Sequence, residues 1–134
     1  MTATMVDSCV LLDILTEDPA WFEWSSRAID GAIETGRLII NPIIYAEISI
    51  GYERIEELES VLPKNIMDFR PITREAAFLA GKCFLEYRQR GGIRTSPLPD
   101  FFIGAHASVE NIPLITRDTT HFRSYFPNVE LIHP

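Results

Sequence analysis

Residues 37–49 read RLIINPIIYAEIS and pass from a strand pattern directly into a helix pattern. The apolar run that ends at Ile40 is typical of a short buried strand. Asn41 is a preferred N-cap residue and Pro42 suits the first helical position, so a helix is expected to begin there. A strand followed at once by a helix is the unit from which parallel sheets are built.

The alternation of strand and helix patterns continues in both directions along the chain. Strands are predicted at residues 5–10, 37–40, 66–70, 112–116 and 129–132. Helices are predicted at residues 19–34, from residue 42 onward, and at 53–62, 74–90 and 101–110. A loop rich in glycine and proline separates the last two helices. This order predicts an α/β fold in which a central parallel sheet carries helices on both faces.

The length and composition fit a single domain spanning residues 1–134. Of the 134 residues, 46% are hydrophobic and 23% are charged, which is enough apolar material for a core. No apolar run approaches the roughly 18 residues of a membrane span, and the N-terminus does not resemble a secretory signal. We therefore expect a cytoplasmic protein without membrane contact. The net charge of −7 argues against a general nucleic-acid coat but is compatible with an acidic metal site.

Cysteine and histidine residues form no recognisable metal or disulfide pattern. Cys9 and Cys83 are the only cysteines, and both lie among apolar residues, so two buried reduced thiols are expected. His106, His121 and His133 are too scattered to suggest a catalytic pair of imidazoles. His106 is expected on a helix surface or in packing.

Two acids stand in apolar surroundings. Asp7 lies between Val6 and Ser8 in the first predicted strand, where desolvating a charge is expensive unless a metal ion, a cation or several hydrogen bonds compensate. Glu47 is flanked by apolar residues on its helix, and Gly51, four residues on, leaves room for an approaching group. A structural role for Asp7 and partial exposure of Glu47 are the alternative interpretations.

Two further acids lie where the chain changes from one element to the next. Asp100 precedes a helix on which Gly104 and Ala107 form a small-residue face, which indicates close packing behind the acid. Asp118 follows the strand at 112–116, and ligands of open α/β sheets bind beyond the carboxyl ends of the strands. Helix capping by Asp100 and turn formation by Asp118 are the alternatives.

Four motifs together resemble the PIN-domain family. They are VDSCVLLD at residues 6–13, AEISIG at 46–51, LPDFFIGAHA at 98–107 and LITRD at 114–118. The best match within the family is the VapC-type toxins of bacterial and archaeal toxin–antitoxin pairs, and the resemblance covers nearly the whole chain. The chain departs from the family pattern in its Gly-Ala-His after the third acid and in its long proline-containing approach at 95–99. Both departures bear on the substrate-contact surface.

The resemblance implies a three-layer α/β/α sandwich with an acidic quartet and two neighbouring hydroxyl residues. The quartet is Asp7, Glu47, Asp100 and Asp118, and the hydroxyl residues are Ser8 and Thr116. Such a site suits Mg²⁺, for which Mn²⁺ can substitute, because carboxylate oxygens bind a hard cation that keeps several waters. The implied activity is metal-dependent endonucleolytic cleavage of RNA, in which the metal makes a water acidic enough to attack the phosphodiester. The implied partners are RNA, a small antitoxin protein and a second copy of the chain in a homodimer.

Basic residues gather around the end of the 74–90 helix, the following loop and the last motif. The candidate RNA contacts are Arg88, Arg90, Arg94 and Arg117. These side chains would guide phosphates toward the acids. An ordinary basic helix terminus, favoured by the helix dipole, is the alternative.

Two other protein classes share parts of this pattern. A phosphotransfer or receiver domain also uses an acid at the end of the first strand. The haloacid-dehalogenase type needs a second Asp where Cys9 stands, and the acidic pair and late lysine of a receiver are not evident. A catalytically inactive PIN-like module that binds RNA or protein would normally lack one or more of the acids, and all four are present.

Overall fold

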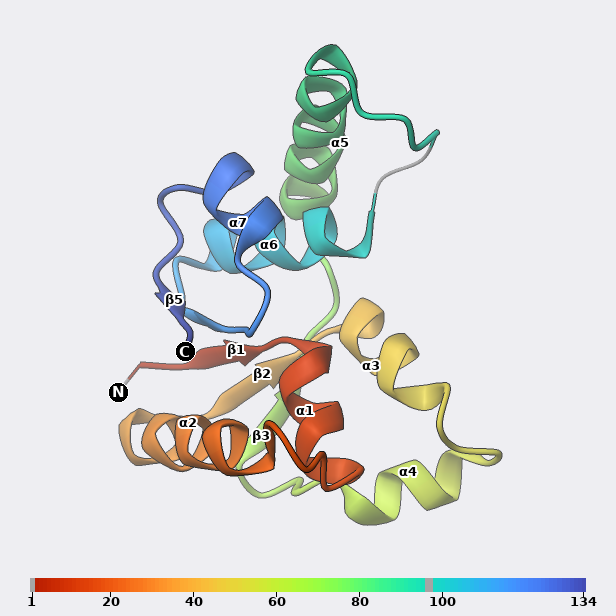
Figure 1. Cartoon of the computed structure of the whole chain (residues 1–134), viewed down its shortest axis with the longest axis vertical. Coiled ribbons are helices and arrows are strands. Elements are labelled where there is room, and N and C mark those ends of the chain that lie inside the picture. Colours follow the sequence, from red (N-terminus) through yellow and green to blue (C-terminus); the bar gives the residue numbers. More distant parts are fainter. Residues whose placement is uncertain (1, 96–97) are drawn as a thin grey trace.

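The computed structural model describes residues 2–95 and 98–134, which form a five-stranded parallel sheet and its covering helices (Figure 1). The strands are β1 Thr4–Val6, β2 Leu38–Ile40, β3 Met67–Phe69, β4 Leu114–Ile115 and β5 Leu131–Ile132. The helices are α1 Ser8–Leu15, α2 Phe22–Thr35, α3 Pro42–Ser49, α4 Ile55–Val61, α5 Arg74–Gln89, α6 Pro99–Glu110 and α7 Thr120–Tyr125.

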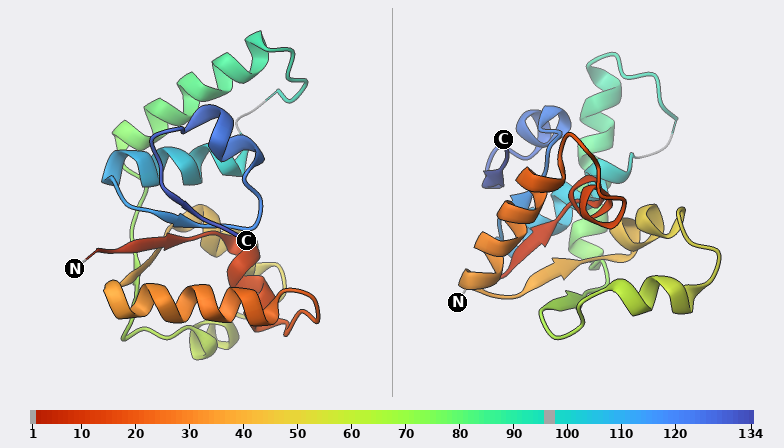
Figure 2. Two further views of the ribbon diagram at one scale, coloured as in Figure 1. Left: turned by 60° about the vertical axis from the view of Figure 1, so that its left-hand side comes forward. Right: turned by 60° about the horizontal axis from the view of Figure 1, so that its bottom comes forward.

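The sheet has the strand order β3-β2-β1-β4-β5, so β1 is central and pairs in parallel with both β2 and β4. Helix α2 lies on one side of β1, and α5 and α6 lie on the other (Figure 2). The three strands at the centre of the sheet are fully or almost fully buried. This arrangement confirms the predicted α/β sandwich with a central parallel sheet.

Local capping signals place two of the helices as predicted. The Asn41 side chain accepts a hydrogen bond from the backbone N–H of Ile44 at 2.9 Å, and α3 begins at Pro42. Thr73 caps α5 in the same way through the N–H of Ala76 at 3.1 Å. In both cases a polar side chain satisfies a backbone donor that has no partner within the helix.

The predicted strand at residues 5–10 is wrong in its second half. The strand ends at Val6, and Asp7 is the N-cap of α1, where its Oδ1 accepts a hydrogen bond from the N–H of Ser8 at 2.8 Å. The apolar residues that follow belong to this helix, with Val10 and Leu11 buried. Asp7 therefore lies at the carboxyl edge of the sheet and not within a strand.

Three smaller differences concern helix boundaries. Helix α2 begins at Phe22 and not at residue 19, because the Asp18 side chain accepts from the N–H groups of Ala20 and Trp21 and closes a turn first. Gly51 follows the end of α3 and does not share a helix face with Glu47. Helix α7 was not predicted.

In the proline-containing approach at 95–99, residues 96 and 97 lie outside the described part of the chain.

No helix in the described part of the chain is long and apolar enough to cross a membrane.

Candidate acidic active site

Asp7 is held at the carboxyl end of the central strand and is almost completely buried, with 5% of its surface exposed. Its Oδ1 accepts from the N–H of Ser8, and its Oδ2 accepts from the hydroxyl of Thr116 at 2.7 Å. The Cys9 thiol lies 3.6 Å from the same Oδ2. Among the described residues, the hydrogen-bond donors to this carboxylate are neutral, and no cation pairs with it.

Glu47 reaches the same edge from α3, which follows the neighbouring strand β2. The hydroxyl of Ser8 donates to Glu47 Oε1 at 2.8 Å. Ser8 therefore contacts both acids, because its backbone N–H bonds Asp7 and its side chain bonds Glu47. The two hydroxyl residues singled out in the sequence, Ser8 and Thr116, each orient one carboxylate.

The charges at this edge oppose full ionisation of Asp7. The pKa of Asp7 is raised from 3.8 to about 6. Burial is the largest cause and the charges of Asp100 and Glu47 act in the same direction, whereas the hydrogen bonds from Thr116 and Ser8 act against it. Burial also raises the pKa of Glu47, with a smaller contribution from Asp100. Two of the four predicted acids, Asp7 and Glu47, are thus close enough to Asp100 for its charge to raise their pKa values.

Asp100 enters this group from the first turn of α6 and is half-buried. The helix begins at Pro99 with Leu98 as its N-cap, so Asp100 does not occupy the capping position. One turn further, a Cβ added at Gly104 would collide with the ring of Phe126, which accounts for the small residue at that position. The close packing expected behind Asp100 is present.

Asp118 lies at the same sheet edge, after β4. The residue is exposed, and its carboxylate faces the backbone of the residues that follow it. Its Oδ1 accepts from the N–H of Thr120 at 3.1 Å, and its own N–H donates to the Thr116 hydroxyl at 3.1 Å. Asp118 is not among the charges that raise the pKa of Asp7. The turn-forming role foreseen as an alternative is therefore realised, and a metal-binding role for Asp118 stays a prediction.

The donor chemistry of this edge suits a hard divalent cation. Asp7, Glu47 and Asp100 offer only carboxylate oxygens, and a cation would relieve the repulsion that raises the pKa of Asp7. Within the described residues, however, no three Asp, Glu, His or Cys side chains form a ready-made metal cage. Mg²⁺ does not require one, because it is commonly held by one or two carboxylates and keeps several waters.

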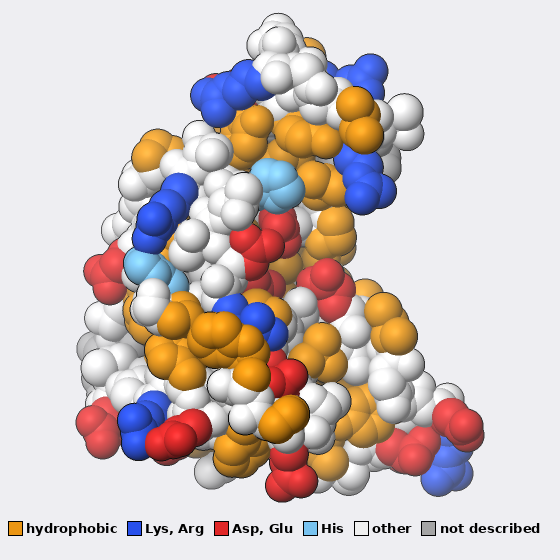
Figure 3. Space-filling view, in the orientation of Figure 1, with side chains coloured by type: hydrophobic (Ala, Val, Ile, Leu, Met, Phe, Trp, Pro, Cys, Tyr) orange, Lys and Arg blue, Asp and Glu red, His pale blue; other side chains and the backbone are white. Residues whose placement is uncertain are grey.

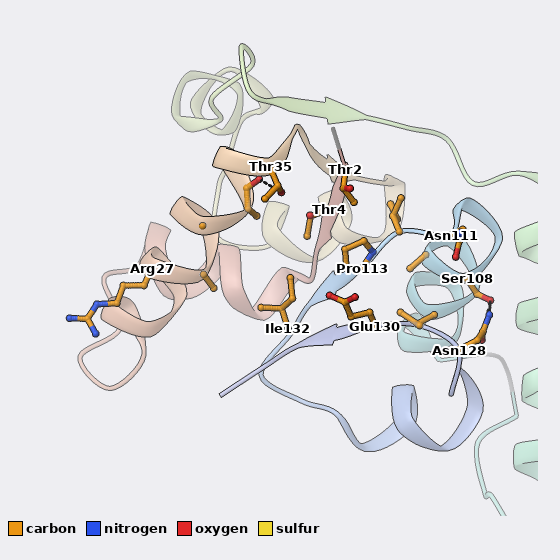
Figure 4. A pocket seen from close by; sticks show the side chains of 16 residues that line it. Thr2, Thr4, Arg27, Thr35, Ser108, Asn111, Pro113, Asn128, Glu130 and Ile132 are labelled. Atoms are coloured by element: carbon orange, nitrogen blue, oxygen red, sulfur yellow. Dashed lines mark hydrogen bonds between the residues drawn. The ribbon is translucent and has the colours of Figure 1, made fainter.

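The molecular surface is hollowed on the side between α5 and α3, and acidic side chains gather along this hollow (Figure 3). A cavity of about 670 Å³ lies elsewhere, between α2 and the β5 side of the sheet (Figure 4). It is lined by Thr4, Ala28 and Pro113 among others and contains none of the four acids. We place the candidate chemistry at the acids and not in this cavity, because the cavity holds no cluster of ionisable groups.

Basic residues gather over the end of α5 and the following loop, where blue side chains are visible at the top of Figure 3. Arg88 donates to the carbonyl of Arg94 at 2.7 Å. Arg90 pairs with Glu86, and its guanidinium lies 4.8 Å from the ring centre of Tyr125. These three side chains remain on the surface.

Arg117 is placed differently from the other predicted RNA contacts. Its Nε and Nη2 donate to the two oxygens of Asp13, at 2.7 and 2.9 Å, and its guanidinium lies 4.9 Å from a ring centre of Trp21. Asp13 is 3% exposed and also accepts from the Ser25 hydroxyl at 2.7 Å. The cation of Arg117 is therefore engaged by a buried carboxylate.

Three contacts at the site were not anticipated from the sequence. His121 contacts Asp100, the Asp13–Arg117 pair flanks the Asp118 turn, and the Cys9 thiol touches Asp7. Both cysteines are free thiols, as expected. Cys83 is buried, but Cys9 is only half-buried, so the expectation of two buried thiols is wrong for Cys9. His106 is a packing residue, 1% exposed, with its Nδ1 3.1 Å from the Asn41 amide.

The chain belongs to the PIN domain family, whose model matches residues 4–126. PIN domains are generally nucleases, so the chain belongs to a family of phosphodiester-cleaving hydrolases in that broad sense. No curated protein sequence matches the chain.

Solved structures of toxin–antitoxin complexes share its fold. VapBC2 from Rickettsia felis, bound to a DNA fragment from its promoter, superposes with a TM-score of 0.76 at 20% identity and covers 99% of both chains. VapBC-1 from nontypeable Haemophilus influenzae gives 0.73 at 18% identity over 98% of both chains. A toxin–antitoxin complex from Klebsiella pneumoniae gives 0.70 at 21% identity over 94% of both chains.

Proposed function

We propose that the chain is a Mg²⁺-dependent endoribonuclease and the toxin of a VapC-type toxin–antitoxin pair. The environment of Asp7 is the observation that supports this activity. Its carboxylate is buried, its pKa is raised in part by the charges of Asp100 and Glu47, and its hydrogen-bond donors among the described residues are neutral. Burying an ionised carboxylate without a neighbouring cation costs free energy, and a bound metal ion would offset this cost. Membership of the PIN domain family and the toxin–antitoxin neighbours support the assignment.

Asp7, Glu47 and Asp100 would hold the ion, with Asp118 as a fourth candidate ligand. When bound, Mg²⁺ or Mn²⁺ would acidify a water for attack on the RNA phosphodiester and would offset charge on the phosphoryl oxygens. Both oxygens of Asp7 accept a hydrogen bond, from the Ser8 N–H and from the Thr116 hydroxyl, which fixes the plane of this carboxylate. The Ser8 hydroxyl bonds Oε1 of Glu47 and thereby directs Oε2. Such supporting hydrogen bonds orient carboxylate ligands.

We expect purified protein to cleave RNA in Mg²⁺ and not in EDTA, and Asp100→Asn to lose this activity. The same substitution should leave the metal-free melting temperature at or above that of the wild type, because it removes a charge that raises the pKa of Asp7 and of Glu47. At ten times the dissociation constant, Mg²⁺ stabilises the wild type by roughly 1.4 kcal/mol. For a domain of this size that is a shift of a few degrees.

The matched control is Asp30→Asn, which removes one charge from the exposed face of α2. Both variants and the wild type are compared by thermal shift in EDTA and in excess Mg²⁺, with RNA cleavage measured in parallel. Asp30→Asn should behave like the wild type. An equal Mg²⁺-induced shift in Asp100→Asn would show that Asp100 is not part of the metal site.

We further propose that Arg88, Arg90 and Arg94 guide RNA phosphates toward the acids. Replacing all three by Ala should raise the KM for RNA and flatten the dependence of binding on salt, because fewer counterions are released. The matched control replaces three exposed arginines that lie away from the end of α5 and the loop after it. These are Arg27, Arg54 and Arg74. Unchanged cleavage and salt dependence in the first triple variant would remove these residues from the RNA path.

The proposed protein partners are a small antitoxin and a second copy of the chain. The acidic hollow favours an antitoxin segment that places Arg or Lys against the acids, since charge-assisted hydrogen bonds to carboxylates are strong. A structure of the complex in which the acids stay uncovered would contradict this mode of inhibition. Homodimer formation is checked by sedimentation of the isolated chain.

A further inference from the structure

We propose that His121 is a positioning residue for Asp100, and that its Nδ1 holds the Asp100 carboxylate in the orientation used for metal binding. The inference rests on the proposed metal-dependent activity and adds a residue to it. His121 itself is not expected to contact the metal or the RNA.

The contact joins two elements that meet only in the folded protein. His121 lies in the first turn of α7, and its Nδ1 is 3.1 Å from Oδ2 of Asp100 in α6. This is the hydrogen bond that the described residues provide to the Asp100 side chain. Because one imidazole N–H occupies one oxygen, Oδ1 and the remaining lone pair on Oδ2 stay available to a ligand.

The imidazole is itself held by a group of aromatic rings. The ring centre of His121 lies 5.6 Å from that of Phe101, 6.2 Å from that of Tyr87 and 6.4 Å from that of Tyr125. These rings come from α5, α6 and α7, so three helices fix the plane of the imidazole. A donor fixed in this way restricts rotation of the carboxylate that it bonds.

Repulsion between the like charges of the site explains why the orientation of the Asp100 carboxylate needs such a restraint. Asp7 and Glu47 carry like charges close enough to Asp100 for their pKa values to respond. Mutual repulsion would turn a freely rotating Asp100 carboxylate away from the other two acids. The hydrogen bond from His121 opposes this rotation before any metal arrives. Aromatic packing alone would be served equally well by phenylalanine, whereas the contact with Asp100 requires a nitrogen.

The test uses three substitutions of His121 that separate packing from hydrogen bonding. His121→Phe keeps an aromatic ring and removes the donor. His121→Asn places an amide nitrogen the same number of bonds from the backbone as Nδ1, whereas His121→Gln places one at the reach of Nε2. We measure Mn²⁺ affinity by electron paramagnetic resonance of the free ion, and kcat and KM for RNA cleavage in Mg²⁺.

His121→Phe should weaken Mn²⁺ binding by about 10-fold or more and lower kcat with little change in KM, since loss of an outer hydrogen bond typically reduces metal affinity or activity 10- to 100-fold. His121→Asn should restore most of both, and His121→Gln should not. Wild-type metal affinity in His121→Phe overturns the inference. Rescue by Gln and not by Asn also overturns it, because it would assign the role to Nε2.

The failure of this inference is distinguishable from failure of the proposed function. If the wild type binds Mn²⁺ and cleaves RNA while His121→Phe does both equally well, only the role of His121 is lost. If the wild type binds Mn²⁺ without cleaving RNA, the ribonuclease assignment fails and the metal affinities still decide the role of His121. A wild type that binds no Mn²⁺ overturns both.

Discussion

Replacing Asp7 by Asn is expected to lower Mg²⁺-dependent RNA cleavage by more than about 100-fold while leaving the fold intact, an effect larger than the loss of an outer hydrogen bond. The amide cannot supply the charge that would hold the metal. It can still occupy the same hydrogen bonds, because its oxygen can accept from the Ser8 N–H and its NH₂ can donate to the Thr116 hydroxyl. Cleavage of a labelled RNA by equal amounts of folded protein measures the loss, and overproduction should slow cell growth only for the wild type.

The same substitution should change how metal-free stability depends on pH. Because the pKa of Asp7 is raised from 3.8 to about 6, the folded protein binds a proton that the unfolded chain does not bind between these values. The free energy of unfolding therefore rises as pH falls from above 6 toward 4. For Asp7 alone this gain is on the order of 1 kcal/mol between pH 7.5 and pH 5. Glu47, whose pKa is also raised, contributes in the same direction.

Urea denaturation in EDTA at pH 7.5 and pH 5 isolates the contribution of Asp7, because all other groups are common to both proteins. Asp7→Asn should be more stable than the wild type at pH 7.5 and should gain less stability on acidification. Asp30→Asn controls for the change in net charge. Two outcomes would contradict the site: full cleavage activity in Asp7→Asn, or a pH dependence identical to that of the wild type.

Local signals made much of the fold predictable. Asn41-Pro42 and Thr73 begin helices because their side chains satisfy backbone donors within three residues, and such contacts are visible in the sequence. The α/β class with a parallel sheet follows from the alternation of strand and helix patterns. Residues 8–15 were harder, because SCVLLDIL is apolar on most faces and such short runs fit a buried strand as well as a helix.

The position of the acids was predictable in part. Asp7 follows β1, Glu47 lies on the helix that follows β2, and Asp100 lies in the first turn of α6. The charges of Glu47 and Asp100 act on Asp7 at this sheet edge. The sequence predicts either a metal ligand or a turn residue at Asp118, and the choice depends on a local hydrogen bond that its carboxylate accepts from the Thr120 N–H. The contact of His121 with Asp100 was missed for a different reason, since neither neighbouring sequence carries a sign of it.

The Asp13–Arg117 ion pair shows most clearly what the sequence could not reveal. The partners are 104 residues apart. Asp13 is not one of the four acids that the resemblance implies, and Arg117 is a candidate RNA contact. Each residue has an ordinary interpretation by itself. Only the packing of α1 against the turn after β4 makes them a pair.

Arg117→Met is expected to destabilise the protein by about 3 kcal/mol or more, because removal of one partner leaves the other as an uncompensated buried charge. Asp13 has 3% of its side chain exposed, and among the described residues the Ser25 hydroxyl is the hydrogen-bond donor that would remain to it. Asp13→Asn should cost less. It leaves the charge on Arg117, whose side chain is 27% exposed and can reach water.

The double variant Asp13→Asn/Arg117→Met provides the decisive comparison. It removes both charges, so it should be more stable than Arg117→Met alone, whereas independent sites would make the two losses add. Urea denaturation of the four proteins gives the coupling free energy directly. Additive losses, or a loss below about 1 kcal/mol for Arg117→Met, would show that the pair does not hold the turn. Because Arg117 stands between Thr116, which bonds Asp7, and Asp118, loosening this turn should also lower RNA cleavage without touching any acid of the site.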